Sequence, residues 1–374
     1  MSETVYTRGK PGEMPEILDF INFVFSQAHC PHDFKKLLPK VYGHDAPAGM
    51  EEIQYLARSN GKIIACAADL PQTLVFGEHK LLGGFVGNVS VHPYMRGQGH
   101  MKKIMTDLIA DAEKQNMDLL VLGGQRQRYG YFGFENAGIQ LRFRVEAANV
   151  RHVLAKVNCS AIEIREFYEG DVFWSQKVWL SKPVHSLRRT ENYLSVLRSW
   201  QAFPLYIAKN GKQIGYLAGS ELLLEDESLL PEVVKALMQR PGVDQMIFRA
   251  GPHEKERISF FRTLAQETTV APVEMIHVLS WPNVLTALME MRADKLEDGV
   301  RTLDIEGDGI FRVTAQGGKV RVDTLTEAPA DALKLSHLEA ERAFFAIEDA
   351  YLNPVGLPLT WRQLPFYMSE QDGF

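Results

Sequence analysis

The sequence predicts a mixed α/β (α+β) protein of 374 residues, built from three consecutive units of which the second is a degenerate copy of the first. Three observations favour this fold class. A strand, a glycine-containing turn, a helix and a second strand follow one another between Gly87 and Gly124. A short hairpin pattern centred on Asn-Gly occurs before this run and again in the middle of the chain. A last segment alternates helix, hairpin and helix, and the length suffices for two or three domains.

The run from Gly87 to Gly124 defines the first unit. Its opening GNVSV predicts a strand that ends at His92-Pro93, because proline cannot continue a ladder of hydrogen bonds. Helical spacing then places apolar side chains on one face of the next segment, at Met101, Ile104, Met105, Leu108, Ile109 and Ala112. Asn116 closes this helix, and Asp118–Gly124 predicts a buried, parallel strand.

The turn before this helix predicts a phosphate-binding site. Gly97 and Gly99 lack a Cβ atom, so the backbone can approach a ligand closely there. Unpaired amides of the first helical turn and the helix dipole both favour an anion. After the second strand, the hexapeptide 129–134 (YGYFGF) begins with Tyr129, whose phenol can donate a proton. We expect its other aromatic residues, Tyr131, Phe132 and Phe134, to pack in the core.

Arg-Gly-x-Gly alone is a weak signal, but with its flanks it resembles the central signature of the GNAT superfamily of N-acetyltransferases. The hexapeptide 129–134 is similar to that superfamily's Tyr-x-x-x-Gly-Phe element. One departure is Tyr94, which stands where the family has glutamine or arginine; this removes a side-chain contact and leaves the backbone cradle. The rival is a dinucleotide-binding fold, which expects glycines directly after a first strand and fits the Pro93 kink poorly.

The resemblance implies that acetyl-CoA is the cosubstrate. It implies that backbone amides of Val89, Ser90 and Val91 hold the pantetheine arm beside the thioester carbonyl. It places the pyrophosphate at the turn, against Met95, Arg96, Gly97, Gly99, His100 and Met101. His100 would contribute its backbone amide, and Tyr129 would protonate the leaving thiolate.

The middle of the chain predicts a second unit of the same type. LARSNGKII at Leu56–Ile64 and IAKNGKQI at Ile207–Ile214 each predict two strands joined by an Asn-Gly turn. Where the second copy would bind a phosphate it has no Gly-x-Gly and carries carboxylates instead, at Glu225, Asp226 and Glu227. Three negative charges repel a pyrophosphate, so we expect this copy to bind no CoA.

A third unit follows Ser280-Trp281-Pro282-Asn283. A helical stretch leads into a hairpin around Gly317-Gly318 and then into a second helix, an order similar to the sterol-carrier-protein type of domain. We therefore expect a catalytic GNAT domain at 1–145, a degenerate GNAT-like domain at 146–285 and a sterol-carrier-like α+β domain at 286–374.

This order of units resembles the Eis-type (enhanced intracellular survival) acetyltransferases over nearly the whole chain. The resemblance implies that Tyr129 is the catalytic acid and that the C-terminal carboxylate, here on Phe374, enters the active site. A terminal carboxylate is a poor base unless burial raises its pKa or a water relays the proton, but it attracts and orients a cation. The segment Phe85–Val91 offers no glutamate as an alternative base. A frayed, unbound tail is the competing interpretation.

Composition narrows the class of protein. The net charge of −6 argues against nucleic-acid binding, and neither a membrane-spanning stretch nor a signal peptide is expected. Cys30, Cys66 and Cys159 indicate neither disulfides nor zinc, so we expect no metal and a cytoplasmic location. The segment 29–32 (HCPH) fits no common zinc pattern, and we expect it to line the amine pocket.

These observations together predict acetyl transfer from acetyl-CoA to a primary amine of a small, cationic molecule, by direct attack in a ternary complex. The resemblance suggests an aminoglycoside-like or polyamine-like acceptor and a homo-oligomer, such as a hexamer. Two alternatives stay open. One is a protein lysine or N-terminal acetyltransferase, and the other is a non-catalytic carrier of CoA or lipid.

Overall fold

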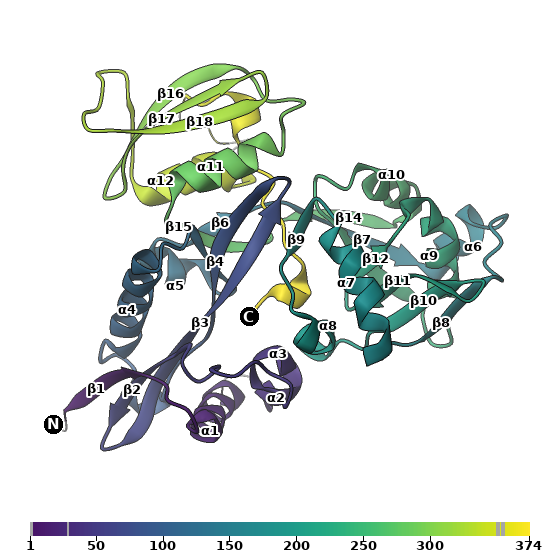
Figure 1. Ribbon diagram of the computed structural model, residues 1–374, viewed down its shortest axis with the longest axis horizontal. Coiled ribbons are helices and arrows are strands. Elements are labelled where there is room, and N and C mark those ends of the chain that lie inside the picture. Colours follow the sequence, from purple (N-terminus) through teal and green to yellow (C-terminus); the bar gives the residue numbers. More distant parts are fainter. Residues whose placement is uncertain (1–2, 28–29, 349–351, 353–355) are drawn as a thin grey trace.

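The computed structural model describes residues 3–27, 30–348, 352 and 356–374, which form three lobes with the C-terminus between them (Figure 1). The mixed α+β architecture predicted from the sequence is confirmed, with four β-sheets among the described residues. The longest described helix has 15 residues, and none of the described helices is both long and apolar enough to span a bilayer.

The first unit is built on an eight-stranded sheet with the order β1-β2-β3-β4-β5-β15-β6, and β9 pairs with β3. Its strands are β1 (Thr4–Arg8), β2 (Gln54–Ser59), β3 (Lys62–Phe76), β4 (His79–Val91), β5 (Leu119–Leu122), β6 (Glu135–Ala137), β9 (Val184–Ser186) and β15 (Glu274–Val278). Its helices are α1 (Met14–Ser26), α2 (Phe34–Leu37), α3 (Pro39–Tyr42), α4 (His100–Lys114) and α5 (Arg126–Tyr129). The predicted helix and the predicted parallel strand are confirmed as α4 and β5.

Helices cover both faces of this sheet because its strands alternate their side chains between two cores. On β2, Tyr55 and Ala57 pack with the apolar stripe of α4, whereas Leu56 between them packs with α1. The hydrophobic spacing that predicted α4 is therefore the stripe that α4 buries, at Ile104, Met105, Leu108 and Ala112.

The second unit has a four-stranded sheet, β12-β11-β10-β8, and a three-stranded sheet, β13-β7-β14. Its strands are β7 (Gln140–Glu146), β8 (Ile162–Glu166), β10 (Leu205–Lys209), β11 (Lys212–Ala218), β12 (Glu221–Leu224), β13 (Gln245–Ala250) and β14 (Glu267–Ala271). Its helices are α6 (Ala147–Val153), α7 (Val172–Leu180), α8 (Tyr193–Leu197), α9 (Leu230–Met238) and α10 (Lys255–Leu264).

Both predicted Asn-Gly hairpins are confirmed, and they match in detail. Asn60 and Gly61 join β2 to β3 with φ of 49° and 76°, and Asn210 and Gly211 join β10 to β11 with φ of 51° and 74°. Two consecutive positive φ values are what a two-residue hairpin turn of type I′ requires. Each hairpin also has one irregularity in its register shortly before the turn. These shared details support the internal repeat.

The two units exchange a strand. β7, which follows the first unit, lies between β13 and β14 of the second, and β15, which follows the second unit, lies between β5 and β6 of the first. The expected boundary at 145/146 thus falls within β7, and the expected second domain, 146–285, includes two strands of the first sheet, β9 and β15. Local patterns predict strands but not their distant partners, which explains this difference.

The third unit packs a four-stranded sheet, β18-β17-β16-β19, against two helices. Its elements are α11 (Trp281–Glu290), β16 (Gly299–Ile305), β17 (Gly309–Gln316), β18 (Lys319–Leu325), β19 (Leu333–Leu335) and α12 (His337–Phe345). The predicted turn at Gly317-Gly318 is confirmed, while the likeness to a sterol-carrier domain stays a prediction. Its core continues into the first sheet, where Trp281 and Phe344 share one cluster with Phe76 and Phe85.

Candidate active site

A gap opens between β4 and β5. These strands pair in parallel only over Gly83–Val86, and β4 continues to Val91. Just beyond the paired part, β4 has a bulge, because Asn88 and Val89 together oppose one residue of β3. Asn88 has a φ of 46° and is held there by its side chain, which donates to Tyr42 Oη at 2.5 Å and to Gln54 Oε1 at 2.8 Å. Asn88 and Val89 of the bulge line the cavity at this gap, and a bulge interrupts the regular pairing of backbone groups.

The glycine turn has the conformation that the sequence predicted for an anion site. Gly97 and Gly99 have φ of 77° and 84°, and Gly99 precedes the first residue of α4. A Cβ atom added to either would meet no other atom within 4 Å among the described residues, so the outer side of the turn is open. First-turn amides of α4 have no acceptor within the helix, which leaves them for a ligand.

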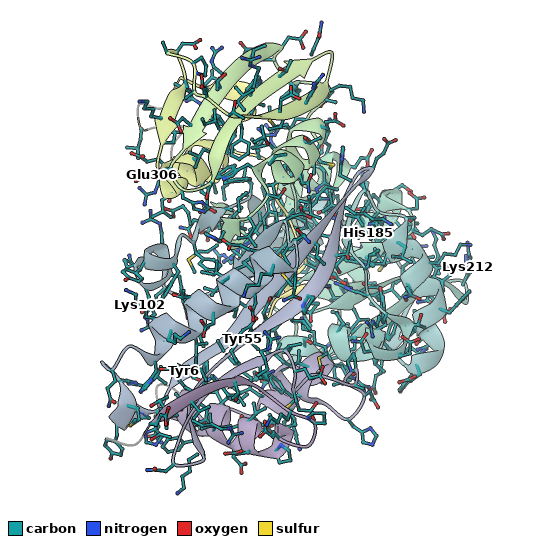
Figure 2. The ribbon with its side chains drawn as sticks, turned by 60° about the vertical axis from the view of Figure 1, so that its left-hand side comes forward. Tyr6, Tyr55, Lys102, His185, Lys212 and Glu306 are labelled. Atoms are coloured by element: carbon teal, nitrogen blue, oxygen red, sulfur yellow. The ribbon has the colours of Figure 1, made fainter. Side chains whose placement is uncertain are left out.

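The remaining residues predicted to bind the cofactor surround this turn. The imidazole of His100 points inward, with its Nδ1 atom 2.8 Å from Tyr6 Oη, so His100 offers its backbone to the outside. Met95 and Met101 pack on the core beneath α4, Ser90 is buried, and Arg96 is exposed. Lys102 lies on the solvent side of α4 (Figure 2). The cofactor-binding roles of these residues stay predictions.

Tyr129 lines a cavity of about 550 Å³ at the gap between β4 and β5. It ends α5 and is 7% exposed, with its ring edge-on to Phe134 and packed on Gly124, where a Cβ atom would lie 2.8 Å from the ring. Burial raises the pKa of the Tyr129 phenol, although the Arg128 guanidinium opposes the shift. The phenol is therefore protonated at neutral pH and can donate. Of its neighbours, Phe134 is buried as predicted; the prediction for Tyr131 is wrong, because that ring is 67% exposed.

Phe374 lines the same cavity as Tyr129. Its ring lies against β4 at Gly87, where a Cβ atom would come within 2.7 Å of it, and near the ring of Tyr42. Glycine at position 87 thus provides the space for the terminal residue. The structure brings together the two residues that the sequence analysis named as catalytic.

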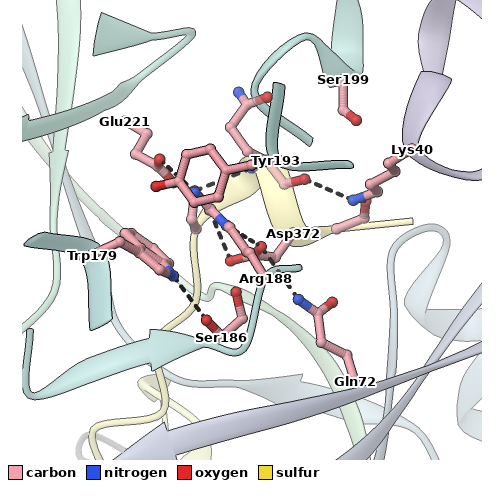
Figure 3. A network of polar contacts seen from close by, with 12 residues as sticks. Lys40, Gln72, Trp179, Ser186, Arg188, Tyr193, Ser199, Glu221 and Asp372 are labelled. Atoms are coloured by element: carbon pink, nitrogen blue, oxygen red, sulfur yellow. Dashed lines mark hydrogen bonds and ion pairs between the residues drawn. The ribbon is translucent and has the colours of Figure 1, made fainter. Parts of the chain in front are cut away.

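A buried polar network holds the tail in place (Figure 3). Asp372 is 1% exposed and accepts from Arg188 Nε at 2.8 Å and Nη2 at 3.1 Å; Arg188 also pairs with Glu221 at 2.6 Å. Lys40 donates to the carbonyl oxygens of Gln371, at 2.6 Å, and of Gly373, at 2.5 Å. The tail is therefore packed against both the first and the second unit rather than frayed.

Two carboxylates that the sequence analysis missed also line the cavity. Glu274, at the start of β15, lies beside the residue that follows β5: its Oε2 atom is 3.0 Å from the Cβ position of Gly123. Burial raises the pKa of Glu274 to about 7. Glu370 accepts from Arg249 at 2.9 Å and from Ser220 Oγ at 2.8 Å. The cavity thus gathers acidic groups beside the Tyr129 phenol.

Aromatic side chains form the other walls of the cavity, namely Phe25, Phe34, Phe85 and Trp200. His32, from the segment 29–32 that was expected to line an amine pocket, contributes to the lining; His29 lies outside the described residues. Cys30 is exposed.

In the second unit, carboxylates stand at the corresponding helix start. Asp226 accepts from the backbone amide of Ser228, and Glu227 pairs with Arg257 at 2.6 Å, just before α9. These groups already supply negative charge at that end of the helix. That this copy binds no CoA stays a prediction, and the negative charge of Asp226 and Glu227 at the helix start supports it.

Comparisons with known proteins agree with this architecture. Residues 6–137 match the family model described as an acetyltransferase (GNAT) domain, a segment that includes β4, the glycine turn, α4 and Tyr129. The whole chain is similar to a probable N-acyltransferase of unknown function from Enterococcus faecalis V583, with a TM-score of 0.73, 17% identity and 100% of each chain covered.

Two further solved structures also match over 100% of each chain. One is a GCN5-related N-acetyltransferase from Kribbella flavida (TM-score 0.70, 14% identity), and the other is Eis1 from Mycobacterium abscessus (TM-score 0.67, 12% identity). No curated protein matches the sequence. The likenesses show a shared fold, and together with the family model they support an acyltransferase.

Proposed function

We propose that the protein transfers an acetyl group from acetyl-CoA to a primary amine of a small, cationic acceptor. One observation carries the proposal. Tyr129, Glu274 and Phe374, which are far apart in sequence, line a single cavity at the gap between β4 and β5. The bulged strand β4 forms one side of the gap, and the glycine turn follows the end of β4 in the chain. A thioester placed along β4 would bring its carbonyl to these three residues.

The cofactor would bind through the backbone. The turn at Gly97 and Gly99 and the first amides of α4 would hold the pyrophosphate, and Val89–Val91 would bind the pantetheine arm as an additional strand would. This arrangement uses main-chain donors, so the loss of the family's glutamine or arginine at Tyr94 removes little.

The residues of the cavity can then carry out the transfer. The substrate ammonium is attracted by the terminal carboxylate of Phe374 and by Glu370. Glu274 takes the proton from the ammonium, since a base with a pKa of about 7 matches neutral pH. The free amine attacks the thioester carbon, the C–N bond forms and the C–S bond breaks. Tyr129 donates its proton to the departing sulfur, and the resulting phenolate takes up the second proton that the nitrogen loses as the amide forms.

The chemistry of the cavity favours a cationic acceptor. Among the described residues that line the cavity, Glu274, Glu370 and Phe374 supply carboxylates and Arg128 is the one arginine. Aromatic rings can stack on ammonium-bearing carbon chains. A volume of about 550 Å³ is within the range of small-molecule sites. Aminoglycoside-like and polyamine-like amines are the classes we propose. A homo-oligomer and a cytoplasmic location stay predictions.

The test is thiol release from acetyl-CoA across a panel of polyamines, aminoglycosides and a lysine peptide. Tyr129→Phe should lower kcat by about 10²- to 10⁴-fold. Tyr131→Phe is the matched control, because it removes a phenol from the same hexapeptide at an exposed site, and it should leave kcat unchanged. If no amine in the panel releases thiol, the proposed activity is wrong. Preferential turnover of the peptide would instead support a protein acetyltransferase.

A further inference from the structure

A cluster of two histidines and a glutamate lies where the third unit meets the first. His277 is on β15 of the first sheet, and His337 and Glu341 are on α12 (Figure 1). His337 and Glu341 are four residues apart, so they share one face of the helix. The imidazole rings of His277 and His337 lie 4.4 Å apart between centroids, and one potential ligand atom from each of the three residues lies within 4.8 Å of the others.

The outer nitrogen of each imidazole is already fixed by a hydrogen bond. His337 Nδ1 lies 2.6 Å from a carboxylate oxygen of Asp308, which also accepts from Trp281 Nε1 at 2.8 Å. His277 Nδ1 lies 3.1 Å from the carbonyl oxygen of Gly133, an acceptor that requires a proton on this nitrogen. The Nε2 atom of His277 therefore has a free lone pair. Carboxylate or carbonyl partners of this kind orient metal-bound histidines in proteins.

Glu341 supplies an independent observation. Its side chain is fully buried, and its Oε1 atom accepts from the backbone amide of Val278 at 2.8 Å and lies 3.1 Å from His337 Nε2. Its Oε2 atom is buried and has no hydrogen-bond partner among the residues that the structure describes. A buried carboxylate oxygen without a partner is costly, so it points to a ligand.

We propose that His277, His337 and Glu341 bind one divalent transition-metal ion, with Zn²⁺ as the best match. Two imidazole nitrogens and a carboxylate oxygen are a common zinc donor set, and water completes such a site. The ion would link α12 of the third unit to β15 of the first sheet. His277 on β15 also contacts the Tyr129 hexapeptide, through the carbonyl oxygen of Gly133. The sequence analysis expected no metal because it considered cysteine spacing, and these ligands come from distant segments.

The experiment is titration of chelator-treated, full-length protein with Co²⁺ and Zn²⁺ alone. Co²⁺ should bind at about one equivalent with the visible absorption bands of a four-coordinate site, and Zn²⁺ should displace it. Asp308→Asn should weaken binding by about 10- to 100-fold, as the loss of a partner to a metal-bound histidine does. His277→Gln should abolish the bands.

The matched control is His79→Gln. His79 forms a similar imidazole–carboxylate pair with Glu290, at 2.9 Å, but belongs to no group of three potential ligands among the described residues. This variant should bind Co²⁺ as the parent protein does. Absence of one-equivalent binding in the parent protein overturns the proposal whatever the variants do, and so does equal binding by His277→Gln. The readout is metal binding, so the result is independent of acetyl transfer.

Discussion

Replacement of Glu274 by glutamine should lower activity and raise stability at the same time. Burial raises the pKa of Glu274 from 4.5 to about 7, so the folded protein binds a proton there that the unfolded chain releases. The stability that proton binding at Glu274 contributes is fully present below the pKa of the unfolded chain, 4.5, and is lost as pH rises through about 7. That shift corresponds to a cost of about 3 kcal/mol above pH 7. The near-isosteric variant removes this cost and the proton acceptor together.

Two assays follow the two effects. The kcat/KM of acetyl transfer should fall tenfold for each pH unit below about 7 in the parent protein, because Glu274 is then protonated. In Glu274→Gln the rate should drop by about 10²- to 10⁴-fold and this acid limb should vanish. Urea unfolding should give the free energy of unfolding of both proteins at pH 5 and at pH 8. The advantage of the variant over the parent should grow by up to about 3 kcal/mol from pH 5 to pH 8. Any effect of the glutamine on packing is the same at both pH values and cancels in this comparison.

The matched control is Glu370→Gln, which removes another carboxylate of the cavity. Glu370 is bound by Arg249 and Ser220, so its loss should raise KM for the amine and leave the acid limb in place. An acid limb of unchanged midpoint in Glu274→Gln would refute the assignment of Glu274 as the base. If the difference in free energy of unfolding between variant and parent is the same at pH 5 and pH 8, the raised pKa of Glu274 is refuted.

Three further outcomes are expected. Gly87→Ala should lower kcat while the protein stays folded, because its Cβ atom would lie 2.7 Å from the Phe374 ring; Gly130→Ala, with open space around the position, should not. Asp372→Asn should destabilise the fold by about 3–5 kcal/mol in thermal unfolding, since Arg188 loses a buried partner. Because Arg188 lowers the pKa of Asp372 despite burial, this contribution should disappear only in strong acid. Extension beyond Phe374 should abolish acetyl transfer, and unchanged activity would exclude the terminal carboxylate.

Local patterns were enough to predict the local structure around the proposed cofactor site. The β4 strand, the turn at Gly97 and Gly99, α4 and Tyr129 lie within one short stretch, where hydrophobic period and glycine position decide the structure. The Asn-Gly turns were equally predictable, since only a few residues tolerate two consecutive positive φ values.

The acceptor side could not be predicted in this way. Glu274 reaches the cavity because β15 pairs with β5, and no local signal specifies that partner. In the sequence, Glu274 is marked by nothing more than its place as the first residue of the strand 274–278. Arg188 likewise has no motif, and its position depends on a packing contact between the tail and the second unit. Long-range pairing places both residues.

The geometry separates cofactor binding from acetyl transfer. Gly97 and Gly99 belong to the first unit alone, whereas Glu274 arrives on the exchanged strand and Phe374 on the tail that leaves the third unit. The pair between Asp372 and Arg188 helps to hold the tail at the cavity, as a buried carboxylate without its partner would be strongly unfavourable. A chain with an undocked tail would therefore still bind acetyl-CoA but would lack the carboxylate that orients the amine. On the proposed mechanism, transfer, unlike binding, would require all three units to be assembled.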